Sequence, residues 1–275
     1  MKRFFSGSRG PLDLFQRKGL SETLATPGPH ETALTRLFGA EGMRRRSDGL
    51  CFQTPLVVIA FTNRSGSNLL ADYVRQGKVA GPAGEFLNHD FVTKHAREQG
   101  ITRLPDYMLY LQTRFAGPAG ALAIKASWDQ LAMLHRTGLT GMFPEVRVLH
   151  MLRQDVLAQA VSYVIALHTK QWTSKHAVEQ DEVPFKPDLI EHVAADFHQA
   201  NLLIRLICDA TGMRRWALAY EQMCHDPATH VGNVLVPAGL APKDWAPDVP
   251  RISKQAGPRN AEMQAAVLAR LRAVL

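Results

Sequence analysis

A short turn rich in serine and glycine follows the first strongly apolar segment of the chain. It reads Arg64-Ser65-Gly66-Ser67-Asn68 and leads into a segment with helical character. Consecutive backbone N–H groups in such a turn converge on one anion, and the N-terminus of a helix adds partial positive charge. Hydroxyl and amide side chains add donors, and an arginine binds phosphate or sulfonate in a bidentate manner. The turn therefore predicts an anion-binding site, although a simple strand-to-helix turn would also use a glycine.

This turn is not a Walker A loop, which requires the pattern G-x-x-x-x-G-K-[ST]. The leading glycine is missing, and Gly66 is followed by Ser67-Asn68 instead of Lys-Ser. The lysine and the Mg²⁺-binding hydroxyl of a nucleoside triphosphatase have no evident substitute. A nucleotide-dependent kinase is an alternative that these absences weigh against.

A second polar group follows a later apolar segment at 146–152. Arg153 stands at the exit of that segment, Asp155 is a suitable N-cap for the next helix, and Ser162 lies about two turns into it. An arginine and a hydroxyl in this arrangement can bind a second phosphate. A surface arginine and a helical serine bonded to its own backbone would give the same pattern.

Apolar runs alternate with helical patterns throughout residues 55–275. We expect strands at 55–61, 121–125, 146–152 and 216–220, and helices near 129–136, 155–169, 189–210, 227–240 and 261–275. This alternation predicts an α/β fold of three layers, a parallel sheet flanked by helices. Ligands of such sheets bind beyond the carboxyl ends of the strands, which here means after Phe61, Lys125 and Leu152. The segments 86–118 and 173–187 look irregular.

The first 50 residues differ in composition from the rest of the chain. Residues 1–50 are rich in Gly, Pro, Ser and Arg, and we expect an N-terminal extension, irregular or partly helical and loosely attached. Residues 51–275 are expected to form the compact α/β domain.

Overall composition excludes several classes of protein. The chain has 275 residues with 46% hydrophobic and 21% charged residues, which rules out wholesale disorder. Three cysteines without a CxxC motif argue against a disulfide framework and indicate a cytoplasmic protein. No apolar run reaches 18 residues, so no transmembrane segment is expected. None of the 11 histidines has metal-ligand spacing, and no metal is expected.

His150, on an apolar strand, is expected to be a core residue, and His168 and Trp172 are expected to serve packing.

The formal net charge of +7 is compatible with nucleic acid, an anionic membrane surface or small anions. Part of it is the cluster at 44–46. No basic stripe with interleaved aromatic residues is present, and we expect no nucleic-acid partner. A non-catalytic protein that binds anions or nucleic acid is the second alternative.

The two polar segments together resemble a specific group of enzymes. The RSGS turn, followed by R-x-D-x-x-x-Q-A-V-S at 153–162, resembles the sulfotransferases that use 3′-phosphoadenosine 5′-phosphosulfate (PAPS), in particular the bacterial trehalose 2-sulfotransferase family. Further similar segments occur in the expected order at 79–86, 125–130, 169–172 and 254–256. The resemblance covers residues 54–260 and implies a P-loop-like sulfotransferase fold.

The resemblance also implies roles for individual residues. The turn 64–68 would hold the 5′-phosphosulfate, Arg153 and Ser162 would hold the 3′-phosphate, and Lys254 would lie in a segment that closes over the nucleotide. Glu85 would be the general base. Asn68 stands where threonine is usual, and Gly84 stands before Glu85 where a larger residue is common.

The implied reaction transfers a sulfuryl group in line from a phosphate oxygen to an acceptor hydroxyl. By analogy with phosphoryl transfer, the protein mainly positions the reactants and stabilises charge, here through Arg64 and the turn amides. A base such as Glu85 takes the hydroxyl proton. The acceptor would be a carbohydrate or glycolipid, with trehalose and a larger oligosaccharide both open. A homodimer is also open.

Overall fold

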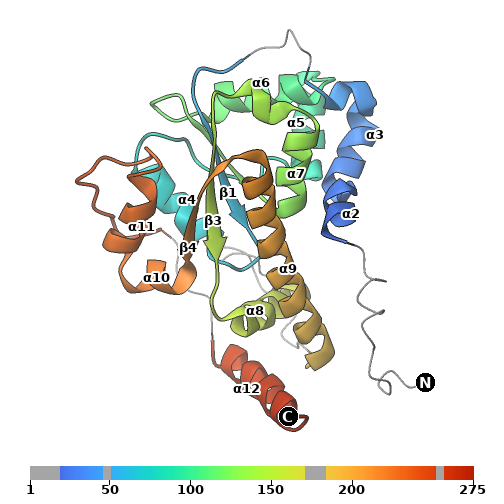
Figure 1. Cartoon of the computed structure of the whole chain (residues 1–275), viewed down its shortest axis with the longest axis vertical. Coiled ribbons are helices and arrows are strands. Elements are labelled where there is room, and N and C mark those ends of the chain that lie inside the picture. Colours follow the sequence, from blue (N-terminus) through green and yellow to red (C-terminus); the bar gives the residue numbers. More distant parts are fainter. Residues whose placement is uncertain (1–18, 46–50, 171–183, 252–256) are drawn as a thin grey trace.

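The structure, a computed structural model, describes residues 19–45, 51–170, 184–251 and 257–275 (Figure 1). Its centre is a four-stranded sheet in the order β2-β1-β3-β4, with every pair of neighbours parallel. The strands are β1 Leu56–Phe61, β2 Leu122–Ala126, β3 Val146–Leu152 and β4 Arg214–Ala219. The predicted α/β fold with a parallel sheet is therefore confirmed.

Strand β1 is the most buried element of the sheet. All of its six residues are buried, and it pairs with both β2 and β3, so that Val58 lies between Ile124 and Val148. A strand that is covered on both faces and paired on both edges has no polar surroundings. This position explains why its sequence is a continuous apolar run instead of an alternating one.

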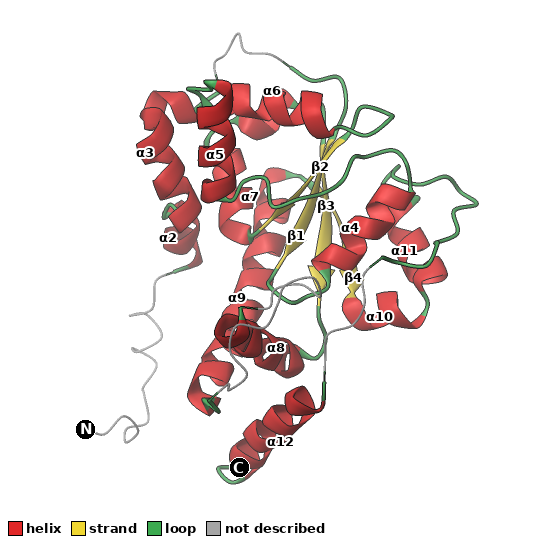
Figure 2. Cartoon of the chain, turned by 180° about the vertical axis from the view of Figure 1, so that it is seen from behind, coloured by secondary structure: helices red, strands yellow, loops and turns green. Residues whose placement is uncertain are grey.

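Helices cover both faces of the sheet, as Figure 1 and, from behind, Figure 2 show. One face carries α4 Ser67–Gln76, α10 Tyr220–His225 and α11 Pro227–Leu235. The other carries α3 Pro29–Met43, α5 His89–Gln99, α6 Leu104–Phe115, α7 Trp128–Arg136, the short 3-10 helix Leu139–Met142 and α9 Pro187–Thr211. The remaining described helices are α2 Leu20–Ala25, α8 Val156–Thr169 and α12 Pro258–Arg272, of which α8 and α12 share a small core with α9.

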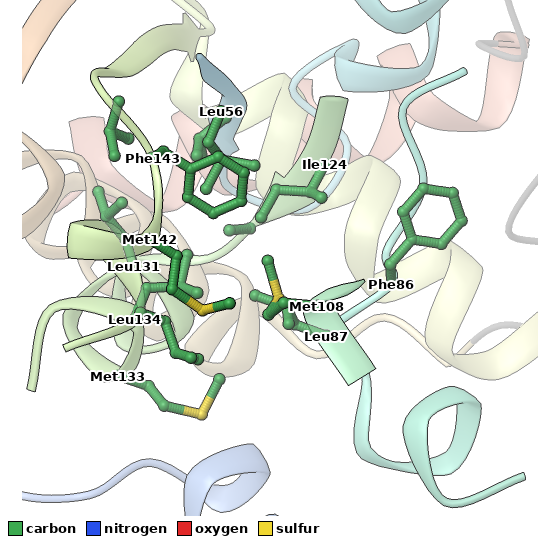
Figure 3. Packing of buried hydrophobic residues seen from close by; sticks show 14 of the residues in the cluster. Leu56, Phe86, Leu87, Met108, Ile124, Leu131, Met133, Leu134, Met142 and Phe143 are labelled. Carbon is green, nitrogen blue, oxygen red and sulfur yellow. The ribbon is translucent and has the colours of Figure 1, made fainter. Parts of the chain in front are cut away.

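The larger core lies between the sheet and the second group of helices (Figure 3). Leu56 and Ile124 project from the sheet, and they meet side chains such as Met108 of α6 and Leu131 of α7, all without exposed surface. Because these side chains pack together without solvent-exposed surface, they hold α7 against the carboxyl end of β2. The same packing therefore fixes the turn between β2 and α7.

The segment 86–118 is not irregular, and that expectation was wrong. It forms α5 and α6, and α6 buries Leu104, Tyr107, Met108 and Leu111 completely. Their spacing is that of one face of a helix, so the signal was present in the sequence. Pro105 does not break this helix because it occupies the first turn, where its missing N–H would have had no partner within the helix.

The N-terminal segment forms the two helices α2 and α3, which the non-helical residues 26–28 separate, and the expected loose attachment was wrong. Leu34 of α3 has no exposed surface and belongs to the same core as Leu56 of β1. Glu31 forms an ion pair with Arg136 of α7, and both side chains are largely buried. Figure 2 shows α2 and α3 beside α5 and α7. The division of the chain at residue 50 stays a prediction.

None of the helices in the described part of the chain combines the length and the apolarity needed to cross a bilayer.

Candidate functional site

At one position, the turn between β1 and α4 has a backbone conformation that only glycine accommodates. Arg64 and Gly66 both have positive φ angles, of 61° and 94°. A Cβ atom on Gly66 would lie only 2.4 Å from Cδ2 of Tyr220, so conformation and space both exclude a side chain there. The chain consequently turns sharply around Gly66, the N-cap of α4.

This turn contains polar groups that the protein itself leaves unsatisfied. Ser65 has no exposed surface, and its Oγ has no hydrogen-bond partner among the described residues. Gly66 cannot cap α4 with a side chain, and the first N–H groups of a helix have no partners within it. A buried donor without a partner costs about 1–3 kcal/mol. The turn therefore fits an anionic ligand that would accept these hydrogen bonds.

Two arginines meet beside the turn. Arg153 Nη1 donates to the carbonyl oxygen of Arg64 at 3.1 Å, and Arg64 Nε donates to Ser162 Oγ at 3.0 Å. The Arg153 guanidinium also lies 5.0 Å from the centre of the Tyr220 ring. Burial, and then the positive charge of Arg153, lower the pKa of Arg64. Like charges held this close together favour the binding of an anion.

Helix α8 supports the turn from the side. Gln159, which is fully buried, donates from Nε2 to Thr62 Oγ1 at 2.8 Å and to the carbonyl oxygen of Asn63 at 2.7 Å. Asp155 caps the helix by accepting from the N–H of Ala158, as predicted. Three residues of the second segment, Arg153, Gln159 and Ser162, therefore form hydrogen bonds with residues 62–64 of the first.

Glu221 of α10 fixes the turn after β3. Its two carboxylate oxygens accept from the backbone N–H groups of Gln154 and Asp155, at 3.0 and 3.2 Å. Oε1 also lies 3.9 Å from Arg153 Nε. The carboxylate thus holds the backbone turn that carries Arg153 and places a negative charge near its guanidinium. Sequence reasoning did not identify Glu221, whose position in the chain gives no sign of this contact.

Lys125 connects the predicted base to the anion turn. Its ammonium group donates to Glu85 Oε1 at 2.8 Å and to Asn68 Oδ1 at 2.6 Å. Nζ also lies 4.7 Å from the centre of the Phe61 ring. The Lys125 side chain is 5% exposed, whereas that of Glu85 is 51% exposed. A buried ammonium at the carboxyl end of β2 is thus directed at the site by two polar contacts.

The structure therefore brings most of the predicted residues together. The turn 64–68 meets Arg153 and Ser162 directly, and Glu85 joins them through Lys125. Lys254, predicted to close over the nucleotide, lies outside the described residues, as does Trp172. Lys125 and Gln159 belong to the similar segments 125–130 and 153–162, but the sequence predicted no role for them. The sequence feature that could have indicated a role for Lys125 is a lysine within an otherwise apolar strand, since an ammonium is rarely buried without partners.

His150 is a core residue, as predicted. It is 2% exposed, and its Nε2 lies 3.1 Å from Asn201 Oδ1. Burial lowers the pKa of His150 to about 4. Nδ1 of His168 bonds to the carbonyl oxygen of Val164 in its own helix.

A cavity of about 440 Å³ adjoins the anion turn, because its lining includes Thr62 and Asn63, which directly precede the turn in the chain. Its walls combine aromatic rings with carboxylate, amide and hydroxyl groups. The lining residues are Thr23, Phe61, Thr62, Asn63, Ser127, Trp128, Tyr163, Val193, Asp196, Phe197, Gln199, Ala200 and Leu203. This size and lining are typical of sites for small organic ligands. Within the described ranges, no three His, Cys, Asp or Glu side chains are grouped so that they could hold a metal ion.

The sequence of this chain is similar to those of known sulfotransferases. The family model of the Stf0 sulphotransferases matches residues 132–266, which include Arg153 and Ser162. The chain is also 27% identical over 261 residues to a trehalose 2-sulfotransferase of Mycolicibacterium smegmatis, an alignment that covers 76% of this chain and 92% of the relative. These matches confirm the resemblance predicted from the sequence.

A solved structure from a study of the PezAT chromosomal toxin-antitoxin system of Streptococcus pneumoniae also aligns with the chain. It is 9% identical and covers 92% of this chain and 95% of its own, with a TM-score of 0.31. A likeness this weak supports no inference about function.

Proposed function

We propose that this chain, a sulfotransferase similar to the trehalose 2-sulfotransferases, transfers the sulfuryl group of PAPS to a hydroxyl group of a carbohydrate or glycolipid. One observation carries the proposal: the buried, unpartnered hydroxyl of Ser65 lies in an anion turn beside two converging arginines. A donor with phosphate and sulfate groups would satisfy both the orphaned donors and the concentrated positive charge.

The residues around the turn would bind the two charged ends of the donor. The backbone and side chains of 64–68 suit the 5′-phosphosulfate, because they combine N–H groups, hydroxyls and a cation. Arg153 and Ser162 suit the 3′-phosphate. Since Arg153 also holds the Arg64 carbonyl and Arg64 bonds to Ser162, the two phosphate sites would be mechanically linked.

Glu85 and Lys125 would act on the transfer itself. The acceptor oxygen forms a bond to sulfur as the bond from sulfur to the phosphate oxygen breaks, and the hydroxyl proton passes to the Glu85 carboxylate. A general base of this kind increases the reaction rate by a factor of ~10²–10⁴. Lys125 would orient Glu85 through the contact of 2.8 Å and would present its ammonium to the charge that develops on the transferred group.

The cavity of about 440 Å³ is the proposed acceptor site. Phe61 supports this placement because it both lines the cavity and lies against the ammonium of Lys125. The rings of Trp128 and Tyr163 offer apolar faces, and Asp196 offers hydrogen-bond acceptors for hydroxyl groups. A polar ligand with flat apolar faces, such as a sugar, matches this lining.

Thermal denaturation in the presence of nucleotides tests the donor. We expect 3′,5′-ADP to raise the melting temperature, because only a ligand that binds the native state stabilises it. Stabilisation by ATP with Mg²⁺ alone would instead favour a kinase. Stabilisation by DNA that disappears steeply with salt would favour the nucleic-acid alternative.

Mass spectrometry of sulfated products, with PAPS and a panel of sugars and glycolipids, tests the acceptor. Asp196→Asn is expected to raise the KM for the acceptor at least ~10-fold without changing the affinity for 3′,5′-ADP, since the loss of one charged hydrogen bond costs ~1.5–3 kcal/mol. Asp209→Asn, at an exposed position of the same helix, is the matched control. An unchanged acceptor KM in Asp196→Asn would remove the cavity from the proposal.

A further inference from the structure

The N-terminal helices reach the acceptor side of the site. Gly28, the N-cap of α3, packs so closely on α7 that a Cβ atom there would lie 2.3 Å from Asp129 Oδ2. Thr23 of α2 lines the cavity of about 440 Å³. Arg136 of α7 holds both helices, through an ion pair with Glu31 and a hydrogen bond to the carbonyl oxygen of Leu24. Residues that precede the predicted domain thus form part of the cavity wall.

A pair of histidines joins this segment to the segment that carries Glu85. His30 Nδ1, in the first turn of α3, lies 2.8 Å from Nδ1 of His89, the first residue of α5. The backbone N–H of His89 also donates to His30 Nδ1, at 3.2 Å. Glu85 is bound into the same turn, because its carbonyl oxygen accepts from the N–H of Asn88 at 3.0 Å.

The backbone contact defines the role of one ring nitrogen. His30 Nδ1 accepts from the backbone N–H of His89, so in this arrangement the proton of the neutral His30 ring resides on Nε2. In the tautomer that carries its proton on Nδ1, the His89 ring donates to the same lone pair, which the two donors then share. Protonation of His30 at Nδ1 removes the acceptor of the backbone hydrogen bond. This backbone link between α3 and α5 is therefore made only while His30 Nδ1 is unprotonated.

The charged groups around His30 come from three elements. Asp129 faces it from α7, Glu85 from the preceding loop, and His89 and Asp90 from α5. Burial outweighs the neighbouring carboxylates and lowers the pKa of His30 below 6.5. The ring is consequently neutral, and the link intact, at and above pH 7; the link is lost only when the pH falls through the lowered pKa of His30 in the folded state.

We propose that the N-terminal helices supply, through Thr23, part of the acceptor-side wall of the site, and that His30 is a positioning residue that holds this wall and the Glu85 segment together through His89. The proposal rests on the proposed function insofar as the cavity receives the acceptor. It extends the site to a part of the chain outside both the predicted domain and the residues matched by the family model.

Two substitutions separate positioning from general stability. His30→Ala removes the acceptor of both hydrogen bonds, and kcat/KM for the sugar acceptor is expected to fall about tenfold at pH 7.5, because small displacements of reacting groups slow catalysis strongly. The Kd for 3′,5′-ADP is expected to stay within about twofold, since the hydrogen bonds that support the anion turn come from α8 and the end of β3. His30→Asn, whose side-chain oxygen can accept in place of Nδ1, is expected to recover most of the activity. Arg36→Ala, at an exposed position of α3, is the control.

Amide hydrogen exchange of the peptides covering 19–30 and 84–92 tests the link without any acceptor. After correction for intrinsic rates, we expect faster exchange in His30→Ala at pH 7.5, and in the unmodified protein once a series of pH values below 7.5 passes the lowered pKa of His30, but no such pH response in His30→Asn. Unchanged exchange and unchanged kcat/KM in His30→Ala would overturn the proposal. An equal loss of acceptor and nucleotide affinity would also overturn it, by indicating a general structural defect. If the unmodified protein sulfates no acceptor, the proposed function fails while the exchange result still decides the histidine link.

Discussion

Replacing Lys125 by methionine separates the catalytic from the structural contribution of this buried ammonium. Methionine keeps much of the length and apolar volume of the lysine stem but removes the charge and both hydrogen bonds, to Glu85 and Asn68. Both of these partners are exposed, so water can solvate them once the lysine is gone. The variant therefore leaves no buried charge without a partner.

The expected effects on stability and catalysis differ strongly in size. Loss of a contact to a half-exposed carboxylate costs about 0–1 kcal/mol, and removal of a buried charge offsets part of that cost. The melting temperature should accordingly change by no more than about 2–4 °C. Loss of one preorganised donor at the reacting group, by contrast, lowers kcat by ~10²–10³.

Two measurements on the same preparation check this reasoning. Calorimetry gives the melting temperature, and transfer of labelled sulfate from PAPS at saturating acceptor gives kcat. Lys94→Met, at an exposed position of α5, is the matched control and should change neither quantity. A Lys125→Met variant that melts far below the unmodified protein yet keeps its kcat would show that the lysine is structural, and the assignment to catalysis would be abandoned.

Three further predictions concern single side chains. Arg153→Ala should weaken the binding of 3′,5′-ADP by at least ~10-fold and that of 5′-AMP far less, as measured by titration calorimetry. Equal losses of affinity for the two nucleotides would mean that Arg153 serves only to hold the Arg64 carbonyl. Glu85→Gln should reduce turnover by ~10²–10⁴ while PAPS affinity changes little; normal turnover at saturating acceptor would make Glu85 a bystander. Because the pKa of His150 is about 4 when folded and near 6.5 when unfolded, the unfolded state takes up the proton first, and the free energy of unfolding should fall by up to about 3 kcal/mol as the pH drops from 6.5 to 4. Urea titrations of His150→Gln should show a correspondingly flatter pH dependence.

The sequence by itself determined the features that arise from local chemistry. The apolar run at 56–61 predicted a buried parallel strand because a strand of a parallel sheet is covered on both faces, so that all of its residues can be apolar. The turn 64–68 predicted an anion site because its donors are neighbours along the chain. Arg153 and Ser162 flank one strand exit and the helix that follows it, but this local pattern also fits a surface arginine and a helical serine, and their predicted role came from the family resemblance.

The tertiary structure decided which of these local features meet. The contact of Lys125 with Glu85 and Asn68 joins three separate segments, and it exists because β1 and β2 are adjacent, in a register that no local pattern encodes. His30 reaches His89 only because Leu34 anchors α3 in the core. Periodicity along the chain reports which residues are buried, whereas the partner of a buried polar group depends on how distant elements pack. For that reason the anion turn could be read from the sequence, and the lysine and the histidine pair could not.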